Sequence, residues 1–214
     1  VIYTPSKVYP KVQKNDLFKA PITELDAVNV YAVTRTTGIT YTPIAGNTIS
    51  SWRSGAGADD NLSNAVPIGF SFVYNGVRVD SFLVGTGGFI TFNINTPHDG
   101  SDGGAYSWVN SSFSSSTDGA TLTLAPIYDD LDALSLTNMT YLTTGAPGSR
   151  ILTVQFANMA LYITPSVVLN FQIKLYESDG HIEFVYGSMT PGAGAFSYTC
   201  GINGPVISAT PTAA

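Results

Sequence analysis

Residues 68–84 have the sequence Ile-Gly-Phe-Ser-Phe-Val-Tyr-Asn-Gly-Val-Arg-Val-Asp-Ser-Phe-Leu-Val, and this stretch decides the fold. Large apolar side chains recur at every second position from Ile68 to Tyr74, which is the period of a β-strand with one buried face. Asn75-Gly76 follows, and this pair favours a two-residue hairpin turn because both central positions need a positive φ. The stretch therefore predicts two antiparallel strands joined by a tight turn.

Strand patterns of the same kind continue along the chain, with a second tight turn predicted at residues 178–180, Ser-Asp-Gly. No helix is predicted beyond one turn near residues 21–28, and no repeat is found. Strands at this spacing are typical of an antiparallel β-sandwich or jelly roll, so we predict an all-β fold. The strands are expected at residues 68–74, 77–84, 89–94, 121–127, 150–156, 168–176, 181–186 and 196–202.

The 214 residues carry little charge and distribute it unevenly. Only 11% are charged, against a usual ~25%. The first nineteen residues hold Lys7, Lys11, Lys14 and Lys19 with one acid, Asp16. Because the whole chain has 9 basic and 15 acidic residues, five basic and fourteen acidic ones remain for the rest. The chain thus divides into a basic leader and an acidic body.

Composition divides the chain into three zones. We expect an extended N-terminal arm over residues 1–22, where prolines disfavour helix, a single β-sandwich domain over 23–205, and a C-terminal tail over 206–214. A chain of this length can bury a full core without disulfides. Its one cysteine, Cys200, cannot form an internal disulfide, and we expect it to be a small buried side chain.

Several functional classes are disfavoured. An acidic body argues against nucleic acid as a partner, since phosphate binding needs clustered positive charge. No run approaches the ~18 apolar residues of a membrane span, so we expect no transmembrane segment. The opening Val1-Ile2-Tyr3 suggests a processed product. There is no nucleophile elbow, and Glu177 and Glu183, which flank a turn, are expected to be solvated charges. We therefore expect no catalytic residues.

Three aspartates follow a predicted strand within four residues: Asp129, Asp130 and Asp132. Carboxylates at this density repel one another unless a cation or hydrogen-bond donors neutralise them. Ca²⁺ takes six to eight oxygen ligands from such loops, so this is a candidate calcium site. The alternative is that each aspartate accepts backbone N–H bonds in a turn. Other loops could contribute Asp59, Asp60, Asp99 and Asp102.

Two long polar loops, residues 46–66 and 95–120, contain aromatic side chains. Loops of this length in compact domains are usually functional. Exposed aromatics could stack on a glycan or anchor a surface protein; alternatively they fold back onto the sandwich as lids. The candidate ligand contacts are Trp52, Tyr106, Trp108 and Phe113.

Residues 57–204 resemble secreted bacterial β-sandwich domains common in surface proteins of the Bacteroidetes, which are loosely similar to the nidogen-type extracellular domain. The resemblance implies an extracellular, surface-associated module and supplies no catalytic residues. Such domains usually occur inside long multidomain proteins, whereas this chain has one domain. Because of this difference, we expect it to be a stand-alone subunit. The matching segments are 59–63 (Asp-Asp-Asn-Leu-Ser), 66–72 (Val-Pro-Ile-Gly-Phe-Ser-Phe), 82–92 (Phe-Leu-Val-Gly-Thr-Gly-Gly-Phe-Ile-Thr-Phe), 124–131 (Leu-Ala-Pro-Ile-Tyr-Asp-Asp-Leu), 150–156, 170–177 and 182–187.

Two functions remain from these observations. In the first, the protein is a subunit of an extracellular filament or surface layer, whose basic leader adds as a strand to the sheet edge of the next acidic body. Such a head-to-tail contact propagates into a homo-oligomer. In the second, the protein is an adhesin that uses the aromatic loops. The leader could also pack on its own body. The residues of the assembly arm are Val8, Tyr9, Lys11, Val12, Lys14 and Lys19.

Overall fold

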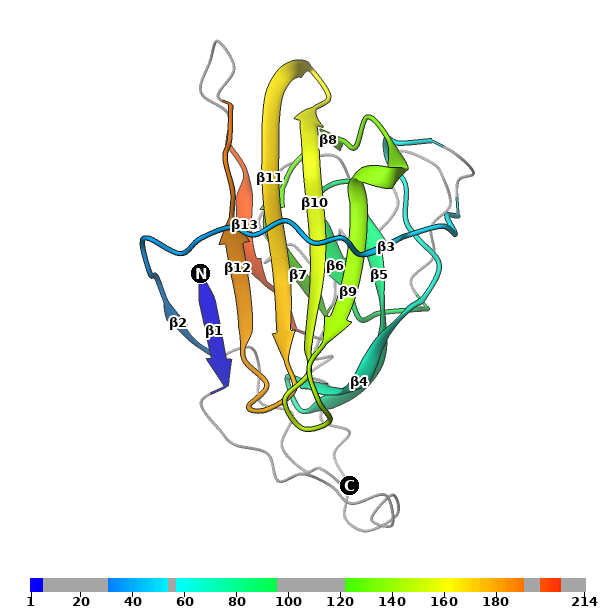
Figure 1. Cartoon of the computed structure of the whole chain (residues 1–214). Helices are drawn as coiled ribbons and strands as arrows, with labels where there is room; N and C mark the ends of the chain where they lie inside the picture. The colour runs from blue at the N-terminus through cyan, green and yellow to red at the C-terminus, as the bar shows by residue number, and fades with distance from the viewer. Residues whose placement is uncertain (6–30, 54–56, 96–121, 191–196, 205–214) are drawn as a thin grey trace, which may run out of the picture.

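The computed structural model describes residues 1–5, 31–53, 57–95, 122–190 and 197–204, and confirms an all-β sandwich of two antiparallel sheets (Figure 1). The larger sheet has eight strands in the order β2-β1-β12-β11-β10-β9-β3, with β8 also paired to β10. Its strands are β1 (Ile2–Pro5), β2 (Tyr31–Thr34), β3 (Asn47–Thr48), β8 (Leu131–Asp132), β9 (Met139–Thr144), β10 (Ile151–Leu161), β11 (Thr164–Tyr176) and β12 (Ile182–Tyr186).

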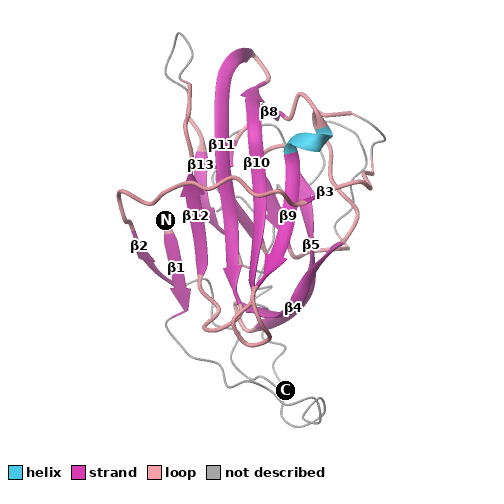
Figure 2. Cartoon of the chain, viewed as in Figure 1, coloured by secondary structure: helices cyan, strands magenta, loops and turns pink. Residues whose placement is uncertain are grey.

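The smaller sheet has five strands in the order β13-β7-β6-β5-β4. The described residues include one short 3-10 helix, Leu136–Asn138 (Figure 2). Within these same ranges, no helix has the length and apolar character that crossing a membrane requires. The strands of the smaller sheet are β4 (Val66–Tyr74), β5 (Val77–Gly85), β6 (Phe89–Thr91), β7 (Thr123–Tyr128) and β13 (Thr199–Ile202).

The predicted hairpin is present as β4 and β5. Its turn residues Asn75 and Gly76 have φ values of 48° and 78°, the positive values that the pair favours. Each of the eight predicted strands overlaps an observed one, but β1, β2, β3, β8 and β9 were not predicted. These five are two to six residues long. Pairing with distant strands forms them, and no hydrophobic period marks them in the sequence.

The core lies between the two sheets and is largely aromatic and aliphatic. Phe156 and Phe171 stack in its centre, with ring centroids 4.7 Å apart. At the lower end in Figure 1, Arg150 joins the sheets: its Nη1 donates to the Gly69 carbonyl at 2.6 Å, and its Nε and Nη2 donate to Glu177 at 2.9 and 2.7 Å. The two sheets are therefore held together by apolar burial in the middle and, at this end, by the hydrogen bond from Arg150, whose guanidinium is fixed by Glu177.

Residues 35–46 cross the outer face of the larger sheet, as Figure 1 shows. Two side chains of the sheet hold this segment: Gln172 Nε2 donates to the Thr42 carbonyl at 2.8 Å, and Gln155 Oε1 accepts from the Ile44 N–H at 2.9 Å. Both glutamines are buried. Buried amides need hydrogen-bond partners, so the crossing segment explains why polar residues lie in the middle of strands β10 and β11.

Two glycines with similar φ values allow a test of packing. Gly88 (φ 83°) lies against β7, where an added Cβ would overlap the Ile127 carbonyl, whereas Gly38 (φ 79°) has open space around it. Both alanine variants meet the same backbone strain, about 1–2 kcal/mol. We expect Gly88→Ala to lower the free energy of unfolding, measured with urea, by several kcal/mol more than Gly38→Ala, because of overpacking. Equal losses would show that the turn around Gly88 is not packed on β7 as described.

Candidate functional site

Carboxylates from two separate loops meet at the upper end of the sandwich. Oxygen atoms of Asp59, Asp60 and Asp130 all lie within 4.8 Å of one another. The two loops are joined by a hydrogen bond from the Ala133 N–H to the Ala58 carbonyl, 3.0 Å long. We call Asp59, Asp60 and Asp130 the acidic end.

The structure distributes the predicted aspartate cluster between two roles. Asp130 faces the acidic end, whereas Asp129 accepts a bond from the Asp130 N–H at 2.9 Å and Asp132 accepts one from the Leu134 N–H at 2.6 Å. Asp129 and Asp132 thus make the turn contacts that were the alternative to a calcium site. Asp99 and Asp102 lie outside the described residues.

Burial and mutual repulsion act on the carboxylates of Asp59 and Asp130. Burial, followed by the charges of Asp60, Asp130 and Asp132, raises the pKa of Asp59 to about 6. Burial also raises the pKa of Asp130. The Oδ1 atom of Asp59 is buried and has no hydrogen-bond partner. A hard cation such as Ca²⁺ fits this set of oxygens, and a proton would neutralise it in the same place.

Melting temperatures can distinguish a proton from Ca²⁺ at the acidic end. Because the folded-state pKa of Asp59 is raised, its charge destabilises the fold as pH rises from about 4 to 6. We expect Asp59→Asn to raise the melting temperature at pH 7 and to leave it nearly unchanged at pH 4. If the site takes Ca²⁺, millimolar Ca²⁺ will raise the melting temperature of the wild type at pH 7 but not that of Asp59→Asn.

Asp80→Asn, at an exposed carboxylate on β5, is the control for a general loss of negative charge. If Ca²⁺ leaves the melting temperature of the wild type unchanged, the site does not bind calcium. If the melting temperature depends on pH in the same way in the wild type and in Asp59→Asn, Asp59 is not the titrating group.

Of the predicted ligand-contact aromatics, the structure describes Trp52. This side chain packs against the core, and its Nε1 donates to the Ile49 carbonyl at 2.9 Å. Trp52 thus takes the lid arrangement that was the alternative to an exposed contact. Tyr106, Trp108 and Phe113 lie outside the described residues.

The first residues of the chain are part of the sandwich. β1 lies between β12 and β2, with Tyr3 opposite Ile182 and Pro5 opposite Tyr31. The N-terminal ammonium of Val1 donates to the Phe184 carbonyl at 2.9 Å, and burial lowers its pKa. The assembly-arm residues themselves lie outside the described residues: Val8, Tyr9, Lys11, Val12, Lys14 and Lys19.

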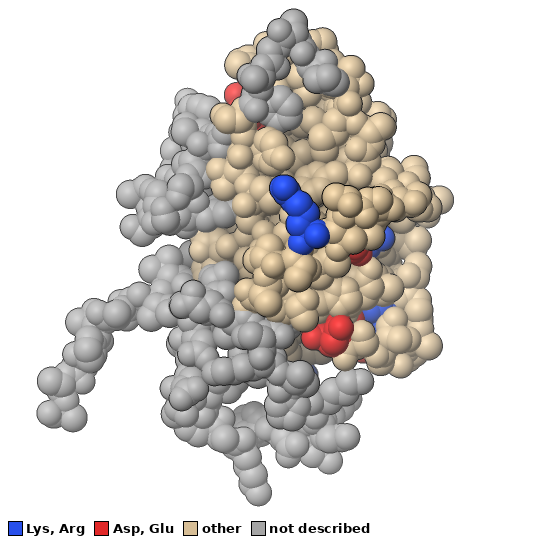
Figure 3. Space-filling model, turned by 90° about the vertical axis from the view of Figure 1, so that its left-hand side faces the viewer, with Lys and Arg blue, Asp and Glu red and all other residues tan. Residues whose placement is uncertain are grey.

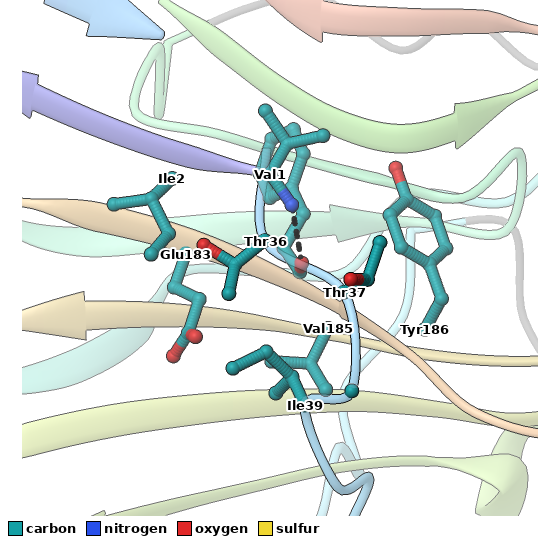
Figure 4. Close-up of a pocket in the computed structure, with 10 residues that line it drawn as sticks. Val1, Ile2, Thr36, Thr37, Ile39, Glu183, Val185 and Tyr186 are labelled. Atoms are coloured by element: carbon teal, nitrogen blue, oxygen red, sulfur yellow. Dashed lines mark hydrogen bonds between the residues drawn. The ribbon is translucent and has the colours of Figure 1, made fainter. Parts of the chain in front are cut away.

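A pocket of about 280 Å³ lies beside the chain start, between β12 and the beginning of the crossing segment (Figure 4). Its lining is mostly aliphatic and hydroxyl side chains, with one carboxylate, from Glu183. Figure 4 shows no second acid facing Glu183 among the residues drawn. Such a lining offers neither a nucleophile with a base nor a set of metal ligands.

The remaining candidates for chemistry have structural partners. Glu177 pairs with Arg150, which holds the pKa of its carboxyl at about 2, and Glu183 accepts from the Tyr176 hydroxyl at 2.8 Å. The prediction for Cys200 was wrong: it is exposed on strand β13, with its Sγ 3.1 Å from the Tyr186 hydroxyl. β13 is the last strand of the smaller sheet, so no further strand of the described residues covers its open side.

Comparison with known proteins gives one match. A family model described as NIDO related matches residues 30–213. No curated protein and no solved structure is similar enough to be matched. The match begins just before β2, so β1 and the leader lie outside it.

Proposed function

The chain belongs to the NIDO-related family, an extracellular type of domain that is not a known enzyme family, and on this premise we propose a structural role. The protein is a secreted, non-enzymatic subunit of an extracellular filament or surface layer. The N-terminal leader of one copy adds to the body of a neighbouring copy, and the contact is repeated from copy to copy.

One observation carries this proposal: the described residues that flank the basic segment, Pro5 and Tyr31, lie at the opposite end of the sandwich from the carboxylate cluster of Asp59, Asp60 and Asp130. Pro5 pairs with Tyr31, so residues 6–30 leave and re-enter the fold at the lower end in Figure 1. Asp130 lies next to β8, at the upper end in the same view. A molecule with a positive segment at one end and negative charge at the other favours head-to-tail association, which stays open and extends.

The sheet edges at β4 and β8 are partly occupied. On β4, the carbonyls of Ile68 and Gly69 already accept bonds from Thr143 and Arg150 at 2.7 and 2.6 Å. β8 is paired with β10 alone among the described strands, but the outward N–H groups of Leu131 and Ala133 already donate to the carbonyls of Asp129 and Ala58 at 2.9 and 3.0 Å. Neither β4 nor β8 is therefore a fully open edge, and the leader would add beside the acidic end through its charges as well as its backbone.

Because the surface carries few charges, the contrast between the basic leader and the acidic end can orient two copies. On the face shown in Figure 3, a few charged side chains are separated by wide areas of uncharged surface. Charges are therefore sparse on this face of the sandwich. Attraction between the leader and the acidic end is then the main charge contrast available to orient two copies. The alternative function, an adhesin acting through loops 46–66 and 95–120, does not need this contrast.

The leader charges give the first test. We expect wild-type protein at low salt to form fibres or sheets, visible by negative-stain electron microscopy. Replacing Lys7, Lys11, Lys14 and Lys19 by glutamine should reduce the assembled fraction, measured by light scattering, about tenfold or more, because the opposite charges are lost. This variant keeps β1 and therefore keeps the fold.

A control variant carries glutamine at Arg78 and Lys174, which lie on β5 and β11 in the body. It should assemble as the wild type does. Wild-type protein that stays monomeric at high concentration and low salt would overturn the structural role, and binding of glycans or surface proteins by that monomer would support the adhesin.

A further inference from the structure

We propose that the leader docks on a specific surface of the neighbouring copy: the tip of the β10–β11 hairpin together with the acidic end. This inference rests on the proposed function and names its receiving site. The occupant is the segment 7–14 of a second copy. The receiving surface consists of Tyr162 and Ile163 at the tip and Asp59 and Asp130 beside it.

The hairpin tip has an unusual composition for a turn. Two other hairpin turns of the sandwich contain Asn75-Gly76 and Asp179-Gly180, residue types that suit turn geometry. The β10–β11 turn instead has Tyr162-Ile163, which offer no such benefit. Both side chains are exposed, Tyr162 at 55% and Ile163 at 84% of their area. Turn geometry does not require these two apolar side chains, so their exposure at the tip indicates a contact surface.

The apolar tip and the acidic end form one surface. The Tyr162 N–H donates to the Asp130 carbonyl at 3.0 Å, so the two residues are direct neighbours across the strands. The carboxylate of Asp130 is in turn within 4.8 Å of that of Asp59. A ligand here would meet two apolar side chains and then concentrated negative charge.

The leader has the matching chemistry. Residues 7–14 read Lys-Val-Tyr-Pro-Lys-Val-Gln-Lys, in which cationic and apolar side chains alternate over a short distance. Val8, Tyr9 and Val12 suit the apolar tip. Lys11 and Lys14 suit the carboxylates, where an ammonium group would take the place that Ca²⁺ or a proton takes otherwise. Proline at position 10 favours an extended backbone.

Chain length prevents the leader from serving its own copy. Lys14 follows Pro5 by nine residues, which span at most ~32 Å when fully extended. β11 runs the length of the sandwich with 13 residues, or roughly 43 Å. Tyr3 is level with the lower end of β11 through Ile182, whereas Ile163 lies beyond its upper end. Residues 7–14 can therefore reach this surface only on another molecule.

The test is a binding titration. A fluorescent peptide of residues 6–19 is titrated with the full chain carrying the four leader glutamines, so that the receiver does not assemble, and anisotropy gives the Kd. We expect Ile163→Ser and Asp130→Asn each to weaken peptide binding about tenfold, a loss of about 1.4 kcal/mol. Millimolar Ca²⁺ should weaken it as well, since both cations need the same carboxylates.

Two variants serve as matched controls. Val33→Ser changes another exposed apolar residue, on β2, and Asp80→Asn changes an exposed carboxylate on β5. Both should leave the Kd within about twofold of that of the four-glutamine parent. Because Ile163 is largely exposed, Ile163→Ser should also keep the parent's melting temperature, which separates a lost contact from a lost fold.

The outcomes distinguish this inference from the proposed function. If Ile163→Ser and Asp130→Asn leave peptide binding unchanged while assembly still needs the leader lysines, the receiving surface is wrong and the structural role stands. If the wild type does not assemble but the peptide binds with the expected sensitivity, the receiving surface stands and the filament is wrong. Peptide that does not bind at low salt overturns the inference.

Discussion

The pairing of Pro5 with Tyr31 is the constraint on which the arrangement of this molecule depends. It ties both ends of the segment 6–30, which contains the four leader lysines, to one end of the sandwich. Without it, the basic segment would be a free N-terminal arm able to reach any surface of its own body. With it, the reach of Lys7, Lys11 and Lys14 is limited by chain length, and the carboxylates around Asp130 lie beyond that reach. The basic segment is thereby tethered at one end of the sandwich, away from the carboxylates around Asp130.

The same pairing changes the meaning of the N-terminal strand. β1 is not an arm outside the fold but an interior strand of the larger sheet, where Tyr3 packs edge-on against Phe184 with ring centroids 5.1 Å apart. In the proposed assembly, the connection that follows β1 is what one copy would offer to a neighbour, and β1 would anchor this connection in the sheet.

Local features of the fold could be predicted and distant ones could not. The turn at Asn75-Gly76 was found from two residues, because turn geometry depends on their own backbone preferences. The acidic end could be predicted only in part: Asp59 and Asp60 were named among the loop aspartates that could join the cluster, but the sequence could not show that they meet Asp130, some seventy residues later, while Asp129 and Asp132 make turn contacts instead. The exposure of Cys200 was missed for a related reason, since the pattern shows a strand but not whether that strand lies at an edge.

The sequence by itself determined the all-β class, the main hairpins and the separation of basic from acidic residues. These follow from side-chain period, turn chemistry and charge, which act over a few residues. Only the tertiary structure decided that β1 lies inside the sheet, that the acidic loops meet, and that Pro5 and Tyr31, which flank residues 6–30, lie at the opposite end from the tip of the β10–β11 hairpin. Those facts depend on strand pairing between residues up to about 180 positions apart, and such pairing is selected by burial of the whole core rather than by any single segment.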